Sequence, residues 1–216
     1  MDSVRFYFSF RSPYSWLAFY RIDRIVDECP VRFEYIPVAL SKALQVSVSV
    51  NPAKRAYICE DIARFADAYG LALRWPDPFD TEWVGPHAAY LFAEAQGKGR
   101  AFALAAYTAR FSEGRDIGTE QVLERLSHAC GLTPEAVIEA AHDSRNHEQV
   151  LTRMRIGRDD GLFGVPFFVF RRHKYWGNDR IEWLLREVYR NAGRNVPNLR
   201  HNPLNCPYDG YAVAAP

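Results

Sequence analysis

Four consecutive residues near the start of the chain, Ser12, Pro13, Tyr14 and Ser15, have the types and order that chemistry could use. They follow an aromatic, β-prone run, and a Ser-Pro pair is typical of a helix N-cap and first helical position. A helix N-terminus presents unpaired N–H groups and the positive end of the helix dipole, which stabilise an anion such as a thiolate. The Ser12 hydroxyl could donate a hydrogen bond to that anion. A purely structural cap explains Ser12 as well, and the two roles are compatible.

The protein has no reactive sulfur at this turn. Ser12 and Ser15 stand where a C-x-x-C motif would place its sulfurs, so the turn cannot form or shuttle a disulfide. A serine hydroxyl is a weak nucleophile without an activating base, and no His or acidic residue adjoins Ser12. We therefore expect the sulfur to come from a bound thiol, and glutathione is the cytoplasmic candidate. A thiol has a pKa of about 8.5, and each unit of lowering favours the thiolate by roughly 1.4 kcal/mol.

Val165-Pro166 precedes a run of buried type at residues 167–170. A proline there could simply open a strand. Were the bond cis, a minority form of X–Pro bonds, the backbone of Val165 would be exposed and could pair with an extended peptide such as glutathione.

Trp176, Gly177, Asn178 and Asp179 lead into the last helical pattern. Asn and Asp at such a place are usually caps. Facing a ligand, the same group could bind both ends of an amino-acid zwitterion, with backbone N–H groups on the carboxylate and Asp179 on the ammonium.

Charge and composition exclude several classes of function. The 27 Lys and Arg residues nearly balance the 26 Asp and Glu residues, which argues against bulk nucleic-acid or membrane-surface binding. No apolar run has the length of a membrane span, and we see no signal peptide, so the expected compartment is the cytoplasm. The six histidines show no metal-ligand spacing, so no metal site is predicted. The four cysteines, which we expect to be free thiols, are Cys29, Cys59, Cys130 and Cys206.

The pattern of elements predicts an α/β protein. A strand at 5–10, a helix from 13 to about 25 and a strand at 31–37 form a β-α-β unit with a parallel pair. Helices follow at 53–69, 87–96, 100–112, 119–130, 134–142 and 145–158, and then strands at 164–170 and 175–176 precede a final helix to about 188. This order is a thioredoxin-like fold with an all-helical insertion. The expected domains are a discontinuous thioredoxin-like domain, residues 1–51 and 150–216, and a helical insertion domain, residues 52–149.

Five motifs in this order carry a family resemblance: FYFSFRSPYSWLA at 6–18, PAKRAY at 52–57, FSEGRDI at 111–117, FGVPFF at 163–168 and WGNDRI at 176–181. Together they resemble the 2-hydroxychromene-2-carboxylate isomerase family, which is similar to kappa-class glutathione transferases and has a disulfide-oxidoreductase-like thioredoxin fold. The resemblance covers residues from about 4 to 190.

The resemblance implies a glutathione-dependent cis–trans isomerisation in aromatic-compound degradation, in which glutathione thiolate adds to the ring-opened substrate and leaves after bond rotation. It implies that Ser12 is catalytic and that Val165, Pro166 and residues 176–179 contact glutathione. Lys54 matches a lysine at the active-site mouth, and the segment 39–51, shorter than in much of the family, ends at Asn51, a candidate for the family's ligand-binding Asn. Tyr14 is a candidate for stacking on a planar aromatic substrate, although core packing is the default for an aromatic residue. A homodimer is also expected.

Three functions stay open at this point. The leading one is the glutathione-dependent isomerase. The second is a kappa-like glutathione transferase or peroxidase, which would share the thiolate site and differ in the second substrate. The third is a glutathione-binding module without catalytic activity.

Overall fold

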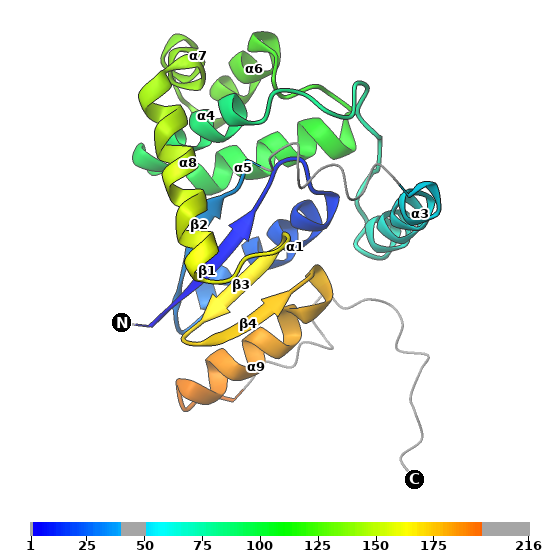
Figure 1. The fold of residues 1–216 in the computed structure, drawn as a ribbon, viewed down its shortest axis with the longest axis vertical. Helices are drawn as coiled ribbons and strands as arrows, with labels where there is room; N and C mark the ends of the chain where they lie inside the picture. The colour runs from blue at the N-terminus through cyan, green and yellow to red at the C-terminus, as the bar shows by residue number, and fades with distance from the viewer. Residues whose placement is uncertain (1, 40–50, 196–216) are drawn as a thin grey trace.

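A four-stranded mixed sheet forms the centre of the molecule, in the order β2-β1-β3-β4. The computed structural model describes residues 2–39 and 51–195 (Figure 1). β1 (Ser3–Phe8) pairs in parallel with β2 (Arg32–Pro37), and antiparallel with β3 (Phe167–Phe170), which pairs with β4 (His173–Trp176). The predicted β-α-β unit with a parallel pair is confirmed.

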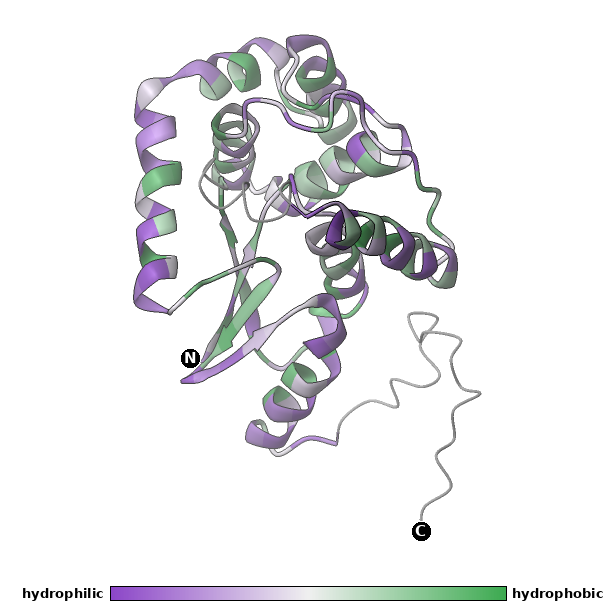
Figure 2. Cartoon of the chain, turned by 45° about the vertical axis from the view of Figure 1, so that its right-hand side comes forward, coloured by the Kyte–Doolittle hydropathy of each residue, from purple (hydrophilic) through white to green (hydrophobic). Residues whose placement is uncertain are grey.

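Helices cover both faces of this sheet, because β1 is apolar on one face, at Val4, Phe6 and Phe8, and buries Tyr7 on the other. Phe6 and Phe8 lie in the large core cluster with α1 (Pro13–Asp23) and α9 (Ile181–Asn191). Tyr7 points to the opposite face, into a smaller cluster against which Met154 of α8 (Ser144–Asp159) packs. In Figure 2, β3 is green, as a strand buried on both faces should be, whereas β4 is pale to purple.

A block of helices stands between β2 and β3 in the sequence. Its members are α3 (Pro52–Ala68), α4 (Val84–Ala95), α5 (Gly99–Tyr107), α6 (Glu120–Cys130), α7 (Pro134–His142) and α8. α4 to α7 gather above the sheet, α3 stands apart beside α1, and α8 runs back along the sheet (Figure 1). The thioredoxin-like fold with a helical insertion is confirmed. The expected boundary between residues 149 and 150 falls inside α8, and the division into two domains stays a prediction.

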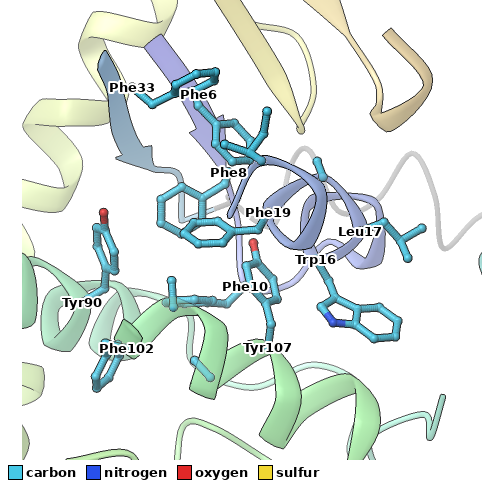
Figure 3. Close-up of a cluster of buried hydrophobic side chains, with 14 of the residues drawn as sticks. Phe6, Phe8, Phe10, Trp16, Leu17, Phe19, Phe33, Tyr90, Phe102 and Tyr107 are labelled. Atoms are coloured by element: carbon cyan, nitrogen blue, oxygen red, sulfur yellow. The ribbon is translucent and has the colours of Figure 1, made fainter. Parts of the chain in front are cut away.

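One aromatic core joins the sheet to the helical block. Phe8 makes an edge contact with Tyr90 of α4, with ring centroids 5.0 Å apart, and Phe10 does the same with Tyr107 of α5 at 5.2 Å. Figure 3 shows these rings meeting between β1, α1 and the green helices. Burial of such rings is worth a few kcal/mol each, so this junction fixes the segment that leads from β1 to Ser12.

Several element ends differ from the sequence expectations. β1 ends at Phe8 because Ser9 and Phe10 bend toward α4, and α1 ends at Asp23, before a 3-10 turn (Val26–Glu28). The helix expected at 100–112 ends at Tyr107 and continues as a π-helical turn (Thr108–Ser112). β4 begins two residues earlier than expected, at His173. Within the described residues, no helix is both long enough and apolar enough to cross a membrane.

Candidate functional site

Ser12 is the N-cap of α1, as the Ser-Pro pair predicts. Its side-chain oxygen accepts a hydrogen bond from the Ser15 N–H at 3.2 Å, and its carbonyl accepts the first helical bond from Trp16. The Ser12 hydroxyl donates to the carbonyl oxygen of Val165, and the distance between the two oxygens is long, 3.4 Å. So weak a bond is easily exchanged for a stronger acceptor, and Ser12 can therefore cap the helix and also donate to a ligand.

The first turn of α1 keeps one further donor. Pro13 has no N–H, and the N–H groups of Ser15 and Trp16 are bonded to Ser12. The Tyr14 N–H makes no backbone hydrogen bond within the described chain. The Ser12 hydroxyl and the Tyr14 N–H are thus a pair of donors at the positive end of a helix, which is the environment that stabilises a thiolate.

The Val165–Pro166 peptide bond is cis, and it faces this helix end. The strand expected from residue 164 therefore begins only at Phe167, after the cis bond. The Pro166 carbonyl accepts from the Gly177 N–H at 3.0 Å, which ties the turn to the end of β4. The structure thus brings Ser12, Val165, Pro166 and Gly177 together, although they are distant in the sequence.

The segment after β4 forms a 3-10 turn, Asn178–Arg180, in place of the direct helix start that was expected. Asn178 is buried, its amide nitrogen donates to the Tyr69 hydroxyl at 3.2 Å, and its carbonyl accepts from Arg21 at 2.6 Å. Its side-chain oxygen is buried without a partner. The Asp179 carboxylate is about half exposed and pairs with Arg180, so of the two side chains only that of Asp179 faces outward.

Trp176 does not belong to the core. Its side chain is 55% exposed and packs edge-on against Phe163, which is 61% exposed, with ring centroids 5.0 Å apart. Gly164 lies against the indole: a Cβ there would come within 2.8 Å of its nitrogen. Phe163 and Trp176 therefore form a pair of exposed aromatic rings beside the cis bond.

Helix α3 borders the site on the side of Tyr14. The Tyr14 hydroxyl donates to Asp61 at 2.7 Å, and burial, followed by this bond, raises the pKa of Tyr14. The charges of Tyr57 and Asp179 act in the same direction, so all three residues lie near Tyr14. With its hydroxyl engaged and its pKa raised, Tyr14 is held in place as a neutral aromatic side chain.

Asn51 and Lys54 lie at the exposed start of α3. The Asn51 side chain caps the helix by accepting from the Lys54 N–H at 3.1 Å. That use as a cap is shown; a role of Asn51 toward a ligand stays a prediction. The Lys54 side chain is exposed, one turn before Tyr57 and two turns before Asp61. The rest of the segment expected to shape the substrate pocket, residues 40–50, lies outside the described residues.

Two buried side chains from the helical block hold the backbone that leads to Ser12. His87 Nε2 accepts from the Phe10 N–H at 3.2 Å, while its Nδ1 donates to the Trp83 carbonyl at 2.5 Å. The Tyr107 hydroxyl donates to the Ser9 carbonyl at 3.0 Å. Burial lowers the pKa of His87 to about 4, so the imidazole is neutral and able to accept.

Sequence reasoning missed three positioning residues, Asp61, His87 and Tyr107, for different reasons. Asp61 lies four positions after Tyr57 on a predicted helix, so the two side chains share one helix face. That shared face was a usable signal that Asp61 lies on the same side of the helix as Tyr57. His87 and Tyr107 gave no such signal, because only the fold brings the helical block against residues 9 and 10. Glu113 forms ion pairs with Arg115 at 3.2 Å and with Arg125 at 3.1 Å. Among residues 2–39 and 51–195, no group of three or more His, Cys, Asp or Glu side chains is arranged to hold a metal.

Comparison with known proteins agrees with this geometry. The chain is 26% identical over 189 residues to a protein of Sphingobium xenophagum named 2-hydroxychromene-2-carboxylate isomerase, covering 84% of this chain and 95% of that one. It is 24% identical over 200 residues to Glutathione S-transferase kappa 1 of Caenorhabditis elegans, covering 84% and 88%. A solved structure of a 2-hydroxychromene-2-carboxylate isomerase superposes with a TM-score of 0.77 at 23% identity, covering 88% of this chain and 98% of that one.

The names of these relatives confirm the resemblance that the five motifs show. Each of the names is that of an enzyme. The model of the DSBA-like thioredoxin domain matches residues 3–189, nearly the whole of the described chain. The chain therefore belongs to the family of DSBA-like thioredoxin domains.

Proposed function

We propose that this protein is a glutathione-dependent isomerase acting on 2-hydroxychromene-2-carboxylate or a related intermediate of aromatic-compound degradation. The observation that carries the proposal is the turn at Ser12: a DSBA-like fold whose active-site helix begins with a hydroxyl in place of a sulfur. The names of the curated relatives support the isomerase reaction, and the relative named Glutathione S-transferase kappa 1 supports the use of glutathione.

The residues around Ser12 fit a thiol tripeptide. The Ser12 hydroxyl, by exchanging its long bond to the Val165 carbonyl, and the Tyr14 N–H can donate to a sulfur at the α1 N-terminus. The backbone of Val165, beside the cis bond, can pair with an extended peptide. The exposed Asp179 carboxylate supplies an acceptor for an ammonium group.

Bound glutathione would supply a thiolate that adds to the conjugated substrate and leaves again after the former double bond has rotated. The protein's own residues have three tasks in this scheme. Ser12 and the α1 N-terminus lower the pKa of the thiol, Tyr14 offers a face for the planar substrate, and Lys54 offers a cation for a carboxylate at the mouth.

The direct test follows the isomerisation by absorbance, with and without glutathione, for the wild type and Ser12→Ala. We expect conversion that needs glutathione, and a turnover about 100-fold lower in Ser12→Ala with glutathione affinity nearly unchanged. Loss of the cap costs about 1 kcal/mol of stability, so unfolding is measured in parallel. Unchanged turnover in Ser12→Ala would remove this residue from the mechanism.

The same experiment separates the two alternatives. Conjugation of a chlorinated aromatic without isomerisation would assign the protein to the kappa-like transferases. Glutathione binding without either activity would assign it to the binding modules. The expected homodimer and the cytoplasmic location stay predictions; light scattering tests the first and cell fractionation the second.

A further inference from the structure

Arg110 is a fully buried guanidinium in the π-helical turn that ends α5. Its central carbon lies 4.5 Å from the ring centroid of Trp83, 5.0 Å from that of Phe111 and 5.1 Å from that of Phe79. An arginine held among three aromatic rings has a rigid position, which is what recognition of a planar anion requires.

Most of the donors of Arg110 have no acceptor. Nη2 donates to the Phe79 carbonyl at 2.5 Å, but Nε and Nη1 are buried without a hydrogen-bond partner. No carboxylate within the described ranges lies close enough for an ion pair with it. Burial lowers the pKa of Arg110 to about 10, so the group still carries its charge at neutral pH. A buried cation without an ion-pair partner is costly, and a carboxylate ligand would reduce that cost.

The charges of two carboxylates, Asp80 and Asp116, act on Arg110, and Asp80 already accepts hydrogen bonds from a neighbouring arginine. Arg11 donates to the two oxygens of Asp80 at 2.5 and 3.1 Å, and Arg11 lies 5.3 Å from the Phe79 ring, which Arg110 also contacts. Burial raises the pKa of Asp80, but the bond and charge of Arg11, the contribution of Trp83 and the charge of Arg110 together outweigh it, so the pKa is lowered. Arg110 therefore reaches Asp80 through its charge alone.

This group of residues adjoins the thiolate site. Arg11 directly precedes Ser12, and Phe111 stacks on Trp16 of α1 with ring centroids 5.4 Å apart. Phe79 and Asp80 lie in a stretch, residues 71–82, without helix or strand. The Asp80 side chain is about half exposed, so it can leave Arg11 without breaking the core.

We propose that Arg11 and Arg110, which both contact the Phe79 ring, form a receptor for the carboxylate of a planar aromatic acid, and that this carboxylate displaces Asp80. Asp80 acts as an internal competitor that occupies Arg11 until the ligand binds. The ligand carboxylate takes the donors of Arg11 and satisfies the unpartnered donors of Arg110. This inference rests on the proposed function for its substrate, and it deepens that proposal by naming the group that the protein recognises.

Isothermal calorimetry with 2-naphthoate, a planar bicyclic carboxylate, and 2-naphthalenemethanol, its uncharged counterpart, tests the receptor without any catalytic readout. We expect the wild type to bind the carboxylate at least about tenfold more tightly than the alcohol. Asp80→Asn should bind 2-naphthoate more tightly than the wild type, because the competitor has lost its charge. Asp77→Asn, in the same stretch, is the matched control and should change nothing.

Arg110→Gln should reduce the affinity for 2-naphthoate about tenfold and leave that for the alcohol unchanged. Should Arg110→Gln fail to fold, Asp80→Asn still decides, since this side chain is half exposed. Equal binding of acid and alcohol by the wild type, or weaker binding of the acid by Asp80→Asn, would overturn the receptor. Binding of 2-naphthoate by a protein that does not bind glutathione would leave the receptor standing and remove the proposed isomerase.

Discussion

His87 makes the stability of this protein sensitive to mild acid. Its pKa is lowered from 6.5 to about 4 by complete burial, and its Nε2 must stay unprotonated to accept the Phe10 N–H. Between these two pH values His87 is therefore protonated in the unfolded chain and neutral in the native protein. Stability falls as the pH drops from about 6.5 to about 4 and levels off below. With about 1.4 kcal/mol for each unit, the loss is about 3 kcal/mol.

The assay is the free energy of unfolding, measured with denaturant at pH 7 and at pH 4. His87→Gln keeps an acceptor at this position but cannot titrate, so its stability should fall by about 3 kcal/mol less than that of the wild type over this range. Carboxylates that titrate in the same window act in both proteins and cancel. His128→Gln, at a side chain that is 67% exposed, is the matched control and should follow the wild type. Equal losses in His87→Gln and wild type would refute the reasoning.

Two further substitutions test contacts that frame the site. Asp160→Asn should lower the free energy of unfolding by about 2 kcal/mol, because Asp160 accepts two hydrogen bonds from Arg5 at 2.6 Å. Asp159→Asn, at an exposed carboxylate, is the control. Equal losses of stability in the two variants would contradict the role of the pair of Arg5 and Asp160. Gly177→Ala should cost about 1–3 kcal/mol and weaken glutathione binding in calorimetry, because φ there is 113°, whereas Gly193→Ala, remote from other side chains, should leave glutathione affinity intact. Unchanged affinity in Gly177→Ala would detach this turn from the ligand site.

The sequence was informative wherever local chemistry decides structure. Ser12 and Pro13 predicted the start of α1, and the β-α-β unit predicted that β2 is parallel to β1. Local patterns were less reliable at element ends, because tertiary contacts decide there. The Phe10 N–H bonds to His87 and not to a neighbouring strand, so β1 stops at Phe8.

The candidate site was only partly predictable. The places of Ser12, Val165 and Asp179 in the fold were foreseeable, because these residues lie in motifs at the turns of a known fold. The cis state of Pro166 was not, because the same dipeptide also opens ordinary strands. Arg110 gave no signal either, since in the sequence it is one arginine on a helix, and only packing removes it from water.

The pKa of the glutathione thiol in the complex tests the central claim most directly. It is measured from the ultraviolet absorbance of the thiolate as the pH is varied, with wild type and with Ser12→Ala. If the hydroxyl and the α1 N-terminus activate a thiol that the protein does not itself carry, the wild type should lower this pKa by at least about one unit below the free value, about 8.5, and Ser12→Ala should lower it less. A bound thiol with the pKa of the free one, or the same pKa in both proteins, would contradict the account.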